Sequence, residues 1–206
     1  MKVIRLELGQ LQTNCYIVIC EETKEAIVID PADEGGFIAE KILSLGLRPM
    51  MIVATHGHFD HVLGLLELKL AFNLPFAIHP DDEFLLKQAR QSALHWLKRQ
   101  VDPVPMNDTR LSEGEEIKFG KEKLKVMHTP GHTPGSVSLY NEKDKILFSG
   151  DTIFAGGAVG RTDFKYSSNK DLRGSIKKLM LLPSETVIYA GHGEESTIGS
   201  EKELFA

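Results

Sequence analysis

Thr55-His56-Gly57-His58-Phe59-Asp60-His61 is the stretch of this sequence that decides both its fold and its chemistry. It places three imidazoles and one carboxylate within six residues, in the pattern H-x-H-x-D-H. In an apolar core, so many polar groups would need a hydrogen-bond partner for every ring nitrogen. A divalent metal ion serves several of these groups at once. The stretch therefore predicts a metal site.

The residues on either side place this stretch at the end of a strand. Met50–Ala54, just before it, is a short apolar run typical of a buried strand. Val62–Leu66, just after it, begins a helical pattern. We therefore expect a strand-to-helix loop at the carboxyl end of a strand, where α/β folds usually place their chemistry.

The composition is that of a globular protein that can bury a core. The 206 residues are 42% hydrophobic and 26% charged, and we expect one domain over 1–206. A net charge of −5 disfavours nucleic-acid and acidic-membrane partners. The first residues lack the long apolar stretch that we would expect of a signal peptide, and no apolar run approaches the roughly 20 residues of a membrane span. Because Cys15 and Cys20 are too few for a disulfide framework, we expect a cytoplasmic protein with core cysteines.

Strand and helix signals are mixed along the chain, and the strands fall into two groups. This order favours an α/β fold of four layers, an αββα sandwich, with a simple α/β sheet as the alternative. The helix at 82–97 could flank a cleft, form a dimer face or cover a sheet, and Trp96 is expected among its packing residues. The expected helices are 37–45, 62–70, 82–97 and 170–181, and the strands are 6–8, 14–20, 26–30, 51–55, 76–79, 117–119, 124–128, 137–140, 146–149 and 186–190.

Three further polar residues follow apolar strands in the same way. His132, Asp151 and His192 each lie on a predicted turn beside glycine, which a loop needs when its backbone passes close to an ion. Since each turn follows a strand end, we expect these side chains to converge with the first stretch. The remaining histidines are interpreted as structural or surface residues: His79, His95 and His128.

The chain thus offers seven candidate metal ligands. Seven are too many for one tetrahedral zinc ion with an open position, and enough for two metals that share a carboxylate. Imidazole and carboxylate suit zinc, iron or manganese, and two zinc ions per chain are our first expectation. The first site would comprise His56, His58 and His132, the second Asp60, His61 and His192, and Asp151 would bridge them.

These motifs resemble those of the metallo-β-lactamase superfamily. Thr55–His61 matches the signature loop of that family, and all seven ligand positions are filled. The resemblance extends from Asn14 to Gly193 and implies an αββα sandwich with a dinuclear metal site at one edge. It also implies that Asp30 orients a metal ligand rather than binding the metal itself.

Within this superfamily, the chain is similar to the glyoxalase II group, the hydroxyacylglutathione hydrolases. Thr129–Ser138 and Gly150–Phe154 match that group, and Gly160–Asp163 fits its short, single-domain members. Full-length members carry a helical domain after the last histidine that helps to hold glutathione. Because only 193–206 follow that histidine, we do not expect this domain here.

Arg161 is a candidate substrate-binding residue. The resemblance places it at about the position of a lysine that contacts the glutathione carboxylate in full-length glyoxalase II. A guanidinium can bind a carboxylate through two parallel hydrogen bonds. A structural ion pair with Asp163 is the alternative that we favour.

The resemblance implies an enzyme, a metal-dependent hydrolase, which we expect to be a thioesterase acting on a small acyl thioester. In this hypothesis a hydroxide bridges the two metals, because each cation lowers the pKa of bound water. Asp60 orients the hydroxide and can take its proton. The leaving thiolate needs little protonation, so no separate general acid is demanded.

Other functions remain open on the sequence alone. A persulfide dioxygenase of this fold would hold one iron with His56, His132 and Asp151, but that group has an Asp-Tyr pair where Gly193-Glu194 follows His192. Hydrolysis of other esters or lactones could use the same metals. RNA processing is disfavoured because the chain is acidic and shows no basic stripe. A purely structural metal module is least favoured, since a dinuclear site with open positions suits catalysis.

Overall fold

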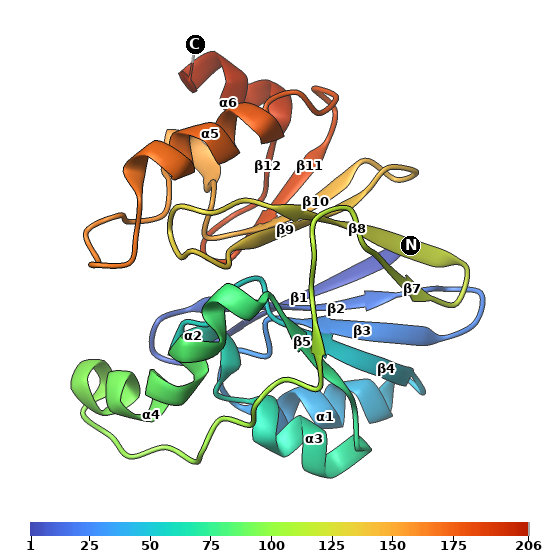
Figure 1. The fold of residues 1–206 in the computed structure, drawn as a ribbon. Helices are drawn as coiled ribbons and strands as arrows, with labels where there is room; N and C mark the ends of the chain where they lie inside the picture. The colour runs from blue at the N-terminus through green and yellow to red at the C-terminus, as the bar shows by residue number, and fades with distance from the viewer. Residues whose placement is uncertain (206) are drawn as a thin grey trace.

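Two six-stranded β-sheets packed face to face form the centre of the computed structural model, which describes residues 1–205 (Figure 1). Helices cover the outer face of each sheet. The predicted αββα sandwich is therefore confirmed, and the alternative of a simple α/β sheet is wrong. Within 1–205, no helix combines the length and the apolar character that crossing a membrane requires.

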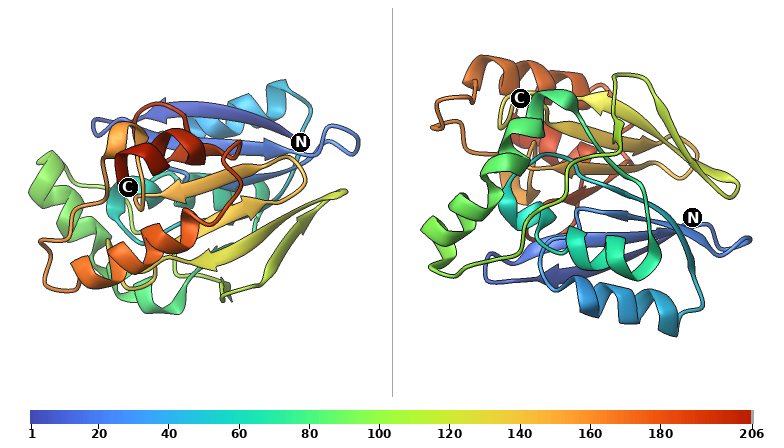
Figure 2. Two further views of the ribbon diagram at one scale, coloured as in Figure 1. Left: turned by 90° about the horizontal axis from the view of Figure 1, so that it is seen from above. Right: turned by 60° about the horizontal axis from the view of Figure 1, so that its bottom comes forward.

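The first sheet is built from the N-terminal half of the chain. Its first three strands are antiparallel and the remaining three run parallel to the third. α1 (Gly35–Ser44) and α3 (Leu65–Phe72) cover its outer face (Figure 2). The strands are, in spatial order, β1 (Lys2–Leu8), β2 (Thr13–Ile19), β3 (Glu25–Ile29), β4 (Arg48–Val53), β5 (Phe76–Ile78) and β6 (Thr109–Arg110).

The second sheet comes from the C-terminal half. α5 (Asn169–Leu179) and α6 (Ile198–Phe205) cover its outer face (Figure 1). All neighbouring pairs are antiparallel except the parallel pair β10–β11. From one edge to the other, the strands are β12 (Ser196–Thr197), β11 (Val187–Ala190), β10 (Ile146–Gly150), β9 (Val137–Asn141), β8 (Glu122–His128) and β7 (Glu116–Phe119).

β2 shows how the sequence produces these layers. All seven of its residues are buried, because one face packs on helices and the other on the second sheet. Cys15 and Ile17 point to the helical layer, whereas Tyr16 and Val18 point into the space between the sheets. There the Tyr16 ring meets the Phe148 ring of β10 edge-on at 5.2 Å. Alternating side chains thus join two layers through a single strand.

The predicted helix at 62–70 is two helices, α2 (Phe59–Val62) and α3. Gly64 lies between them, and a Cβ atom there would approach the Pro31 carbonyl oxygen to 2.5 Å. The Gly64 amide also donates to the Ala32 carbonyl at 2.7 Å. This close backbone approach interrupts the helix and holds α2 against the loop that follows β3.

The 3₁₀ turn η1 (Pro80–Asp82) leads into α4 (Glu83–Leu97), which projects from the same end of the molecule as α2 (Figure 1). Leu86 and Ala93 of α4 are buried as expected. The expectation that Trp96 packs in the core is wrong, because its side chain is 53% exposed. The last turn of α4 extends past the sheets (Figure 1), and the Trp96 indole lies at the surface.

Candidate metal centre

The seven candidate ligands follow the carboxyl ends of four strands. β4 and β10 each continue into a loop that carries ligands, as do β8 and β11. β8, β10 and β11 run in the same direction within their sheet, so their carboxyl ends share one edge. Asp60 and His61 lie within α2, and His58 immediately precedes it. The structure brings all seven side chains together: His56, His58, Asp60, His61, His132, Asp151 and His192.

Three imidazoles form the first group. His58 Nδ1 lies 3.0 Å from His56 Nε2 and 2.9 Å from His132 Nε2. Three nitrogen atoms therefore face a common point, although His132 comes from the other sheet. His56 and His132 are almost completely buried, which keeps bulk water away from two of the three rings.

The second group lies beside the first, and one carboxylate belongs to both. Asp60 Oδ2 lies 3.6 Å from His61 Nε2 and 3.4 Å from His192 Nε2. Asp151 Oδ2 lies 3.4 Å from His132 Nε2 and 3.7 Å from His192 Nε2, while its Oδ1 lies 3.5 Å from His61 Nε2. Asp151 thus stands between the groups, where a bridging ligand is required.

The outward nitrogen of each imidazole has a partner of its own. His132 Nδ1 lies 2.9 Å from the Arg161 carbonyl and His192 Nδ1 lies 3.1 Å from the Leu11 carbonyl. A carbonyl only accepts, so both Nδ1 atoms carry hydrogen and both Nε2 atoms present lone pairs to the centre. The other outward contacts are His61 Nδ1 to Asp30 Oδ2 (3.0 Å), His58 Nε2 to the Tyr166 hydroxyl (2.8 Å) and His56 Nδ1 to Thr55 Oγ1 (3.2 Å).

Burial favours the neutral form of two imidazoles of the first group, His56 and His58. It lowers the pKa of His56 well below its ordinary value, and His61 adds to this effect. Burial and His132 together lower the pKa of His58 to about 3. Neutral imidazoles have free lone pairs, so these two residues can bind a cation without first losing protons.

The second group holds a proton where a cation would lie. Burial opposes the protonation of His61, but three carboxylates outweigh it and raise its pKa to about 10. They belong to Asp151, Asp60 and Asp30. Burial likewise opposes ionisation of Asp60, but His61 and His192 keep the pKa of that carboxyl well below its usual range. A positive charge is therefore favoured at this point, and the His61 proton supplies it when no metal does.

Two atoms at the centre test whether a metal fits. Asp151 Oδ1 and His61 Nε2 are buried and have no hydrogen-bond partner within the described part of the chain. Buried polar atoms without partners are costly, and one cation between these two would satisfy both. Gly191 keeps the space open, because a Cβ atom there would lie 2.1 Å from Asp151 Oδ1. The donor set and its surroundings therefore fit a divalent metal.

Two further carboxylates hold the ligand loops in place. Asp30 Oδ2 accepts from the Thr55 hydroxyl at 2.7 Å besides its contact with His61, so it lies where an orienting role requires. Asp82, fully buried, accepts from the Gly57 amide at 2.9 Å and from the Gly135 amide at 2.7 Å. Asp82 therefore ties the loop of His56 to the loop of His132 across the two sheets.

A cleft of about 370 Å³ opens onto the metal ligands. Arg161 lines it, and both Nε and Nη2 of its guanidinium donate to Asp163 at 2.6 Å. Of the three roles considered for α4, the structure shows that it flanks this cleft. The lining residues are Leu11, His58, Phe59, Asp60, Ser92, Trp96, His132, Asp151, Arg161, Phe164, Tyr166 and His192.

A third histidine group lies outside the centre. His79, Asp81 and His128 come close together, and the two imidazoles stack at 4.3 Å with an angle of only 6° between their planes. Lone pairs lie in the ring planes, so those of two parallel rings do not converge on one ion. His128 Nε2 also donates to the Pro134 carbonyl at 2.9 Å. This stack is a packing contact.

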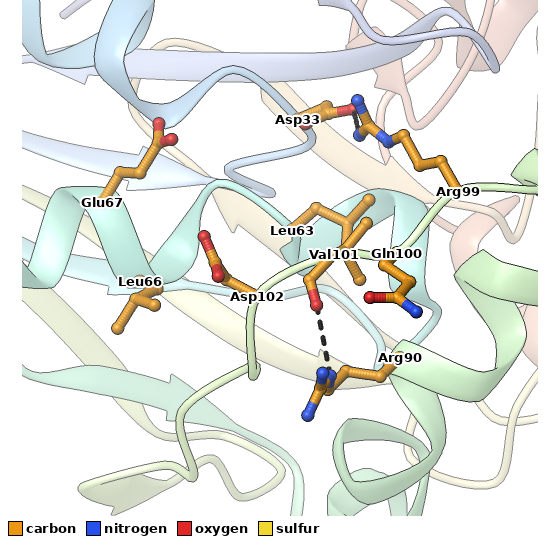
Figure 3. Close-up of a pocket in the computed structure, with 9 residues that line it drawn as sticks. All are labelled: Asp33, Leu63, Leu66, Glu67, Arg90, Arg99, Gln100, Val101 and Asp102. Atoms are coloured by element: carbon orange, nitrogen blue, oxygen red, sulfur yellow. Dashed lines mark hydrogen bonds and ion pairs between the residues drawn. The ribbon is translucent and has the colours of Figure 1, made fainter.

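A second pocket of about 340 Å³ lies between α3 and the end of α4 and carries no histidine (Figure 3). Arg99 pairs with Asp33, and Arg90 Nε donates to the Val101 carbonyl at 3.1 Å. Its arginines thus have partners within the protein. These contacts fix the end of α4 to the loop after β3, and so fix the part of α4 that carries Trp96.

Sequence reasoning missed Tyr166, Asp82 and Trp96 as residues of the site. Tyr166 contacts a histidine 108 residues away, and Asp82 contacts two loops that are far apart in the sequence. Neither belongs to a ligand motif, so only the fold reveals them. Trp96 is the single tryptophan of the chain and lies near the end of a predicted helix, which could have drawn attention to it. The apolar spacing of that helix instead favoured a place in the core.

Comparisons with known proteins agree with this geometry. A family model described as the metallo-beta-lactamase superfamily matches residues 8–192. A Bacillus subtilis protein named probable metallo-hydrolase YqgX is 35% identical, covering 98% of this chain and 95% of its own. A Haemophilus influenzae protein named hydroxyacylglutathione hydrolase GloC is 33% identical over the same shares.

Solved structures are similar over nearly the whole chain. The structure of BLEG-1, titled a B3 metallo-beta-lactamase, has a TM-score of 0.91 and 32% identity, covering 98% of this chain and 97% of its own. The structure of TTHA1623 in a di-iron-bound form has a TM-score of 0.89 and 38% identity, covering 97% of both chains.

Proposed function

Because this chain belongs to the metallo-beta-lactamase superfamily, we propose that it is a metal-dependent thioesterase of the hydroxyacylglutathione hydrolase type. The observation that carries the proposal is the pair of three-ligand groups that share Asp151. The relative named hydroxyacylglutathione hydrolase GloC supports the reaction class. A small acyl thioester is the proposed substrate.

Two divalent cations would be held by the two ligand groups. The first would use the three imidazoles of the first group, and the second would use Asp60 and the remaining two histidines, with Asp151 between them. Zinc is the first choice for this donor set, while iron and manganese share its ligand preferences. When bound, such cations supply a hydroxide nucleophile from water at neutral pH and polarise the substrate carbonyl.

Asp60 is the residue that we propose as proton acceptor. It lines the cleft, and its low pKa keeps it ionised, so it can accept a hydrogen bond from the attacking water. The Thr13 hydroxyl donates to Asp60 Oδ2 at 3.0 Å and limits the rotation of the carboxylate. Asp60 can therefore orient the water through the hydrogen bond that it accepts, and we propose that it takes the proton of the water as the attack proceeds.

The other groups of the cleft favour a leaving group that departs without a proton. Burial, together with Asp82, raises the pKa of Tyr166 to about 12, so its hydroxyl is a weak acid at neutral pH. Arg161 is tied to Asp163 and keeps its proton at any accessible pH. A thiolate leaves readily as an anion, whereas an amide nitrogen needs protonation. This difference supports a thioester as the substrate.

Hydrolysis of S-lactoylglutathione by the metal-reconstituted protein tests the proposal, with metal counted on the same sample. We expect turnover with about two metals per chain, and loss of turnover in Asp60→Ala or His58→Ala protein that retains its circular dichroism spectrum. A β-lactam and a lactone serve as comparison substrates. Absence of thioester turnover with both metals bound, or oxygen uptake with glutathione persulfide and a single iron, would overturn the proposal.

A further inference from the structure

The cleft has an apolar wall beside its metal ligands. Leu11, Trp96 and Phe164 line that wall and come from three separate segments: the loop after β1, the end of α4 and the loop after β10. Trp96 is 53% exposed and Leu11 is 44% exposed. Large apolar groups left in water beside a reaction centre typically mark a surface that a ligand covers.

Arg161 lies beside this wall, and its charge is paired with that of Asp163. Its guanidinium carbon lies 4.5 Å from the centre of the Phe164 ring and 5.8 Å from that of Trp96. The same guanidinium donates twice to Asp163. Arg161 therefore stacks between α4 and the loop after β10, with its charge already compensated.

The consequence concerns the charge of the substrate. Glutathione carries two carboxylates, and binding them tightly requires free cationic side chains. Among the described residues that line the cleft, Arg161 is the single lysine or arginine, and Asp163 occupies it. The anionic side chains that face the cleft, Asp60 and Asp151, belong to the metal centre. The cleft is thus better suited to an uncharged apolar group than to a dicarboxylate carrier.

We infer, on the basis of the proposed thioester hydrolysis, that the natural substrate carries an uncharged apolar group that packs on Trp96, with Leu11 and Phe164 beside it. Trp96 is then the residue that determines specificity, and α4 is the element that presents it. The reaction at the acyl group is the same as in the proposed function. The inference concerns the thiol part of the substrate, which the enzyme would recognise by its apolar character.

A pair of substrates with the same acyl group tests this inference. The two are the lactoyl thioester of hexanethiol and S-lactoylglutathione. We expect kcat/KM to be about tenfold or more higher for the hexanethiol thioester. Trp96→Ala should reduce this preference at least tenfold, and Trp96→Phe should retain part of it. Leu94→Ala is the matched control, because Leu94 is 49% exposed on the same helix and lies outside the cleft lining.

A binding measurement separates this inference from the proposed reaction. Trp96 is the single tryptophan of the chain, so intrinsic fluorescence reports directly on the wall. The neutral thioether 2-(hexylthio)ethanol should shift the emission to shorter wavelength, and S-methylglutathione should leave it unchanged. A shift without any thioester turnover would contradict the proposed thioesterase activity but would support binding of an apolar group at Trp96. No shift, together with a preference for S-lactoylglutathione, would overturn the inference while the thioesterase stands.

Discussion

Each histidine of the metal centre is held by an atom on its outward side. A metal ligand needs one nitrogen free and the ring fixed in orientation, and a hydrogen bond to the other nitrogen achieves both. Two of the outward partners are backbone carbonyls and one is the Asp30 carboxylate. The partners of His56 and His58 are side-chain hydroxyls, and only the hydroxyl at His58 comes from a distant segment, the loop after β10.

Tyr166→Phe should therefore weaken metal binding without disturbing the fold. Loss of the hydroxyl removes the acceptor for His58 Nε2–H and frees the ring to rotate. Changes at such outer partners typically reduce metal affinity about 10–100-fold. Competition with a chromophoric chelator measures the affinity, and the cobalt(II) absorption spectrum reports the geometry. Tyr189→Phe, in the stacked pair with Phe148, is the control. Equal affinity and equal spectra in all three proteins would refute the role of Tyr166.

The protonation of His61 predicts how the metal-free protein responds to pH. Its pKa is raised to about 10 in the folded state, against 6.5 in the unfolded chain. The stability gained from this proton is complete below pH 6.5 and is lost as pH rises toward 10, because the folded state then binds more protons than the unfolded state. Urea unfolding should show the metal-free protein losing stability over this range.

The metal-loaded protein is the comparison for that measurement. A bound cation replaces the His61 proton, so this contribution to the pH dependence should vanish. Titration of lysine and tyrosine residues elsewhere affects both forms equally and cancels in the difference. Parallel pH dependence in the two forms would show that His61 is not the proton carrier.

The ligands themselves could be predicted from the sequence, whereas their supports could not. Seven polar residues after apolar strands stand out as a pattern, and the structure brings them to one place. Tyr166 and Asp82 act through contacts that join distant segments, and such contacts leave no local pattern. Charge compensation of Arg161 by Asp163 was foreseeable because the two lie only two residues apart.

At the scale of elements, α4 has two roles at its two ends. Asp82 at its start fixes the ligand loops, and Trp96 near its end lines the cleft. Arg99, just beyond the helix, pairs with Asp33 and ties this end to the loop after β3 (Figure 3). A helix that lies outside every metal motif therefore positions both the centre and the wall beside it.

Asp82→Asn should destabilise the protein through the link between the two loops. Asp82 accepts from two backbone amides and from the Thr133 hydroxyl, and an amide side chain would direct its own N–H at one of these donors. A buried donor without an acceptor costs about 1–3 kcal/mol. Urea unfolding measures this loss. Asp81→Asn is the neighbouring control, since Asp81 is 59% exposed, and equal stability of the two variants would contradict the link.

Long, periodic elements were predictable, and short ones were not. β2 and α5 follow clear apolar patterns and lie within a few residues of the predicted ranges. β6 and β12 have two residues each, too few to show any period. α6 was also missed, because its eight residues carry few apolar side chains. The break between α2 and α3 at Gly64 depends on the close approach of the Pro31 carbonyl, and the local sequence pattern does not indicate this contact.

At the scale of the molecule, the metal centre joins the two sheets. His56, His58, Asp60 and His61 follow a strand of the first sheet, and the other three ligands follow strands of the second. The order of strands in two groups made the sandwich predictable. The packing of the two sheets face to face depends on the layer of side chains between them, which includes Tyr16 and Phe148 and which no single segment shows.

Removing the metals should therefore destabilise the whole fold. A ligand present at 100 times its dissociation constant adds about 2.7 kcal/mol to the free energy of unfolding. For a chain of this size, that corresponds to a fall in Tm of roughly 5–11 °C on chelation. Calorimetry of chelated and re-loaded protein measures it. An unchanged Tm after complete removal of metal would show that the centre does not connect the sheets energetically.

The spread of the ligands from residue 56 to residue 192 also sets an order of events during synthesis. A ribosome releases His56, His58 and His61 long before β11 delivers His192. The growing chain can then offer only part of a centre, and its lone pairs face water or any cation that is nearby. The pair of metals can be captured only after the second sheet has closed on the first. Loading with both metals should thus be a late step in the maturation of this protein.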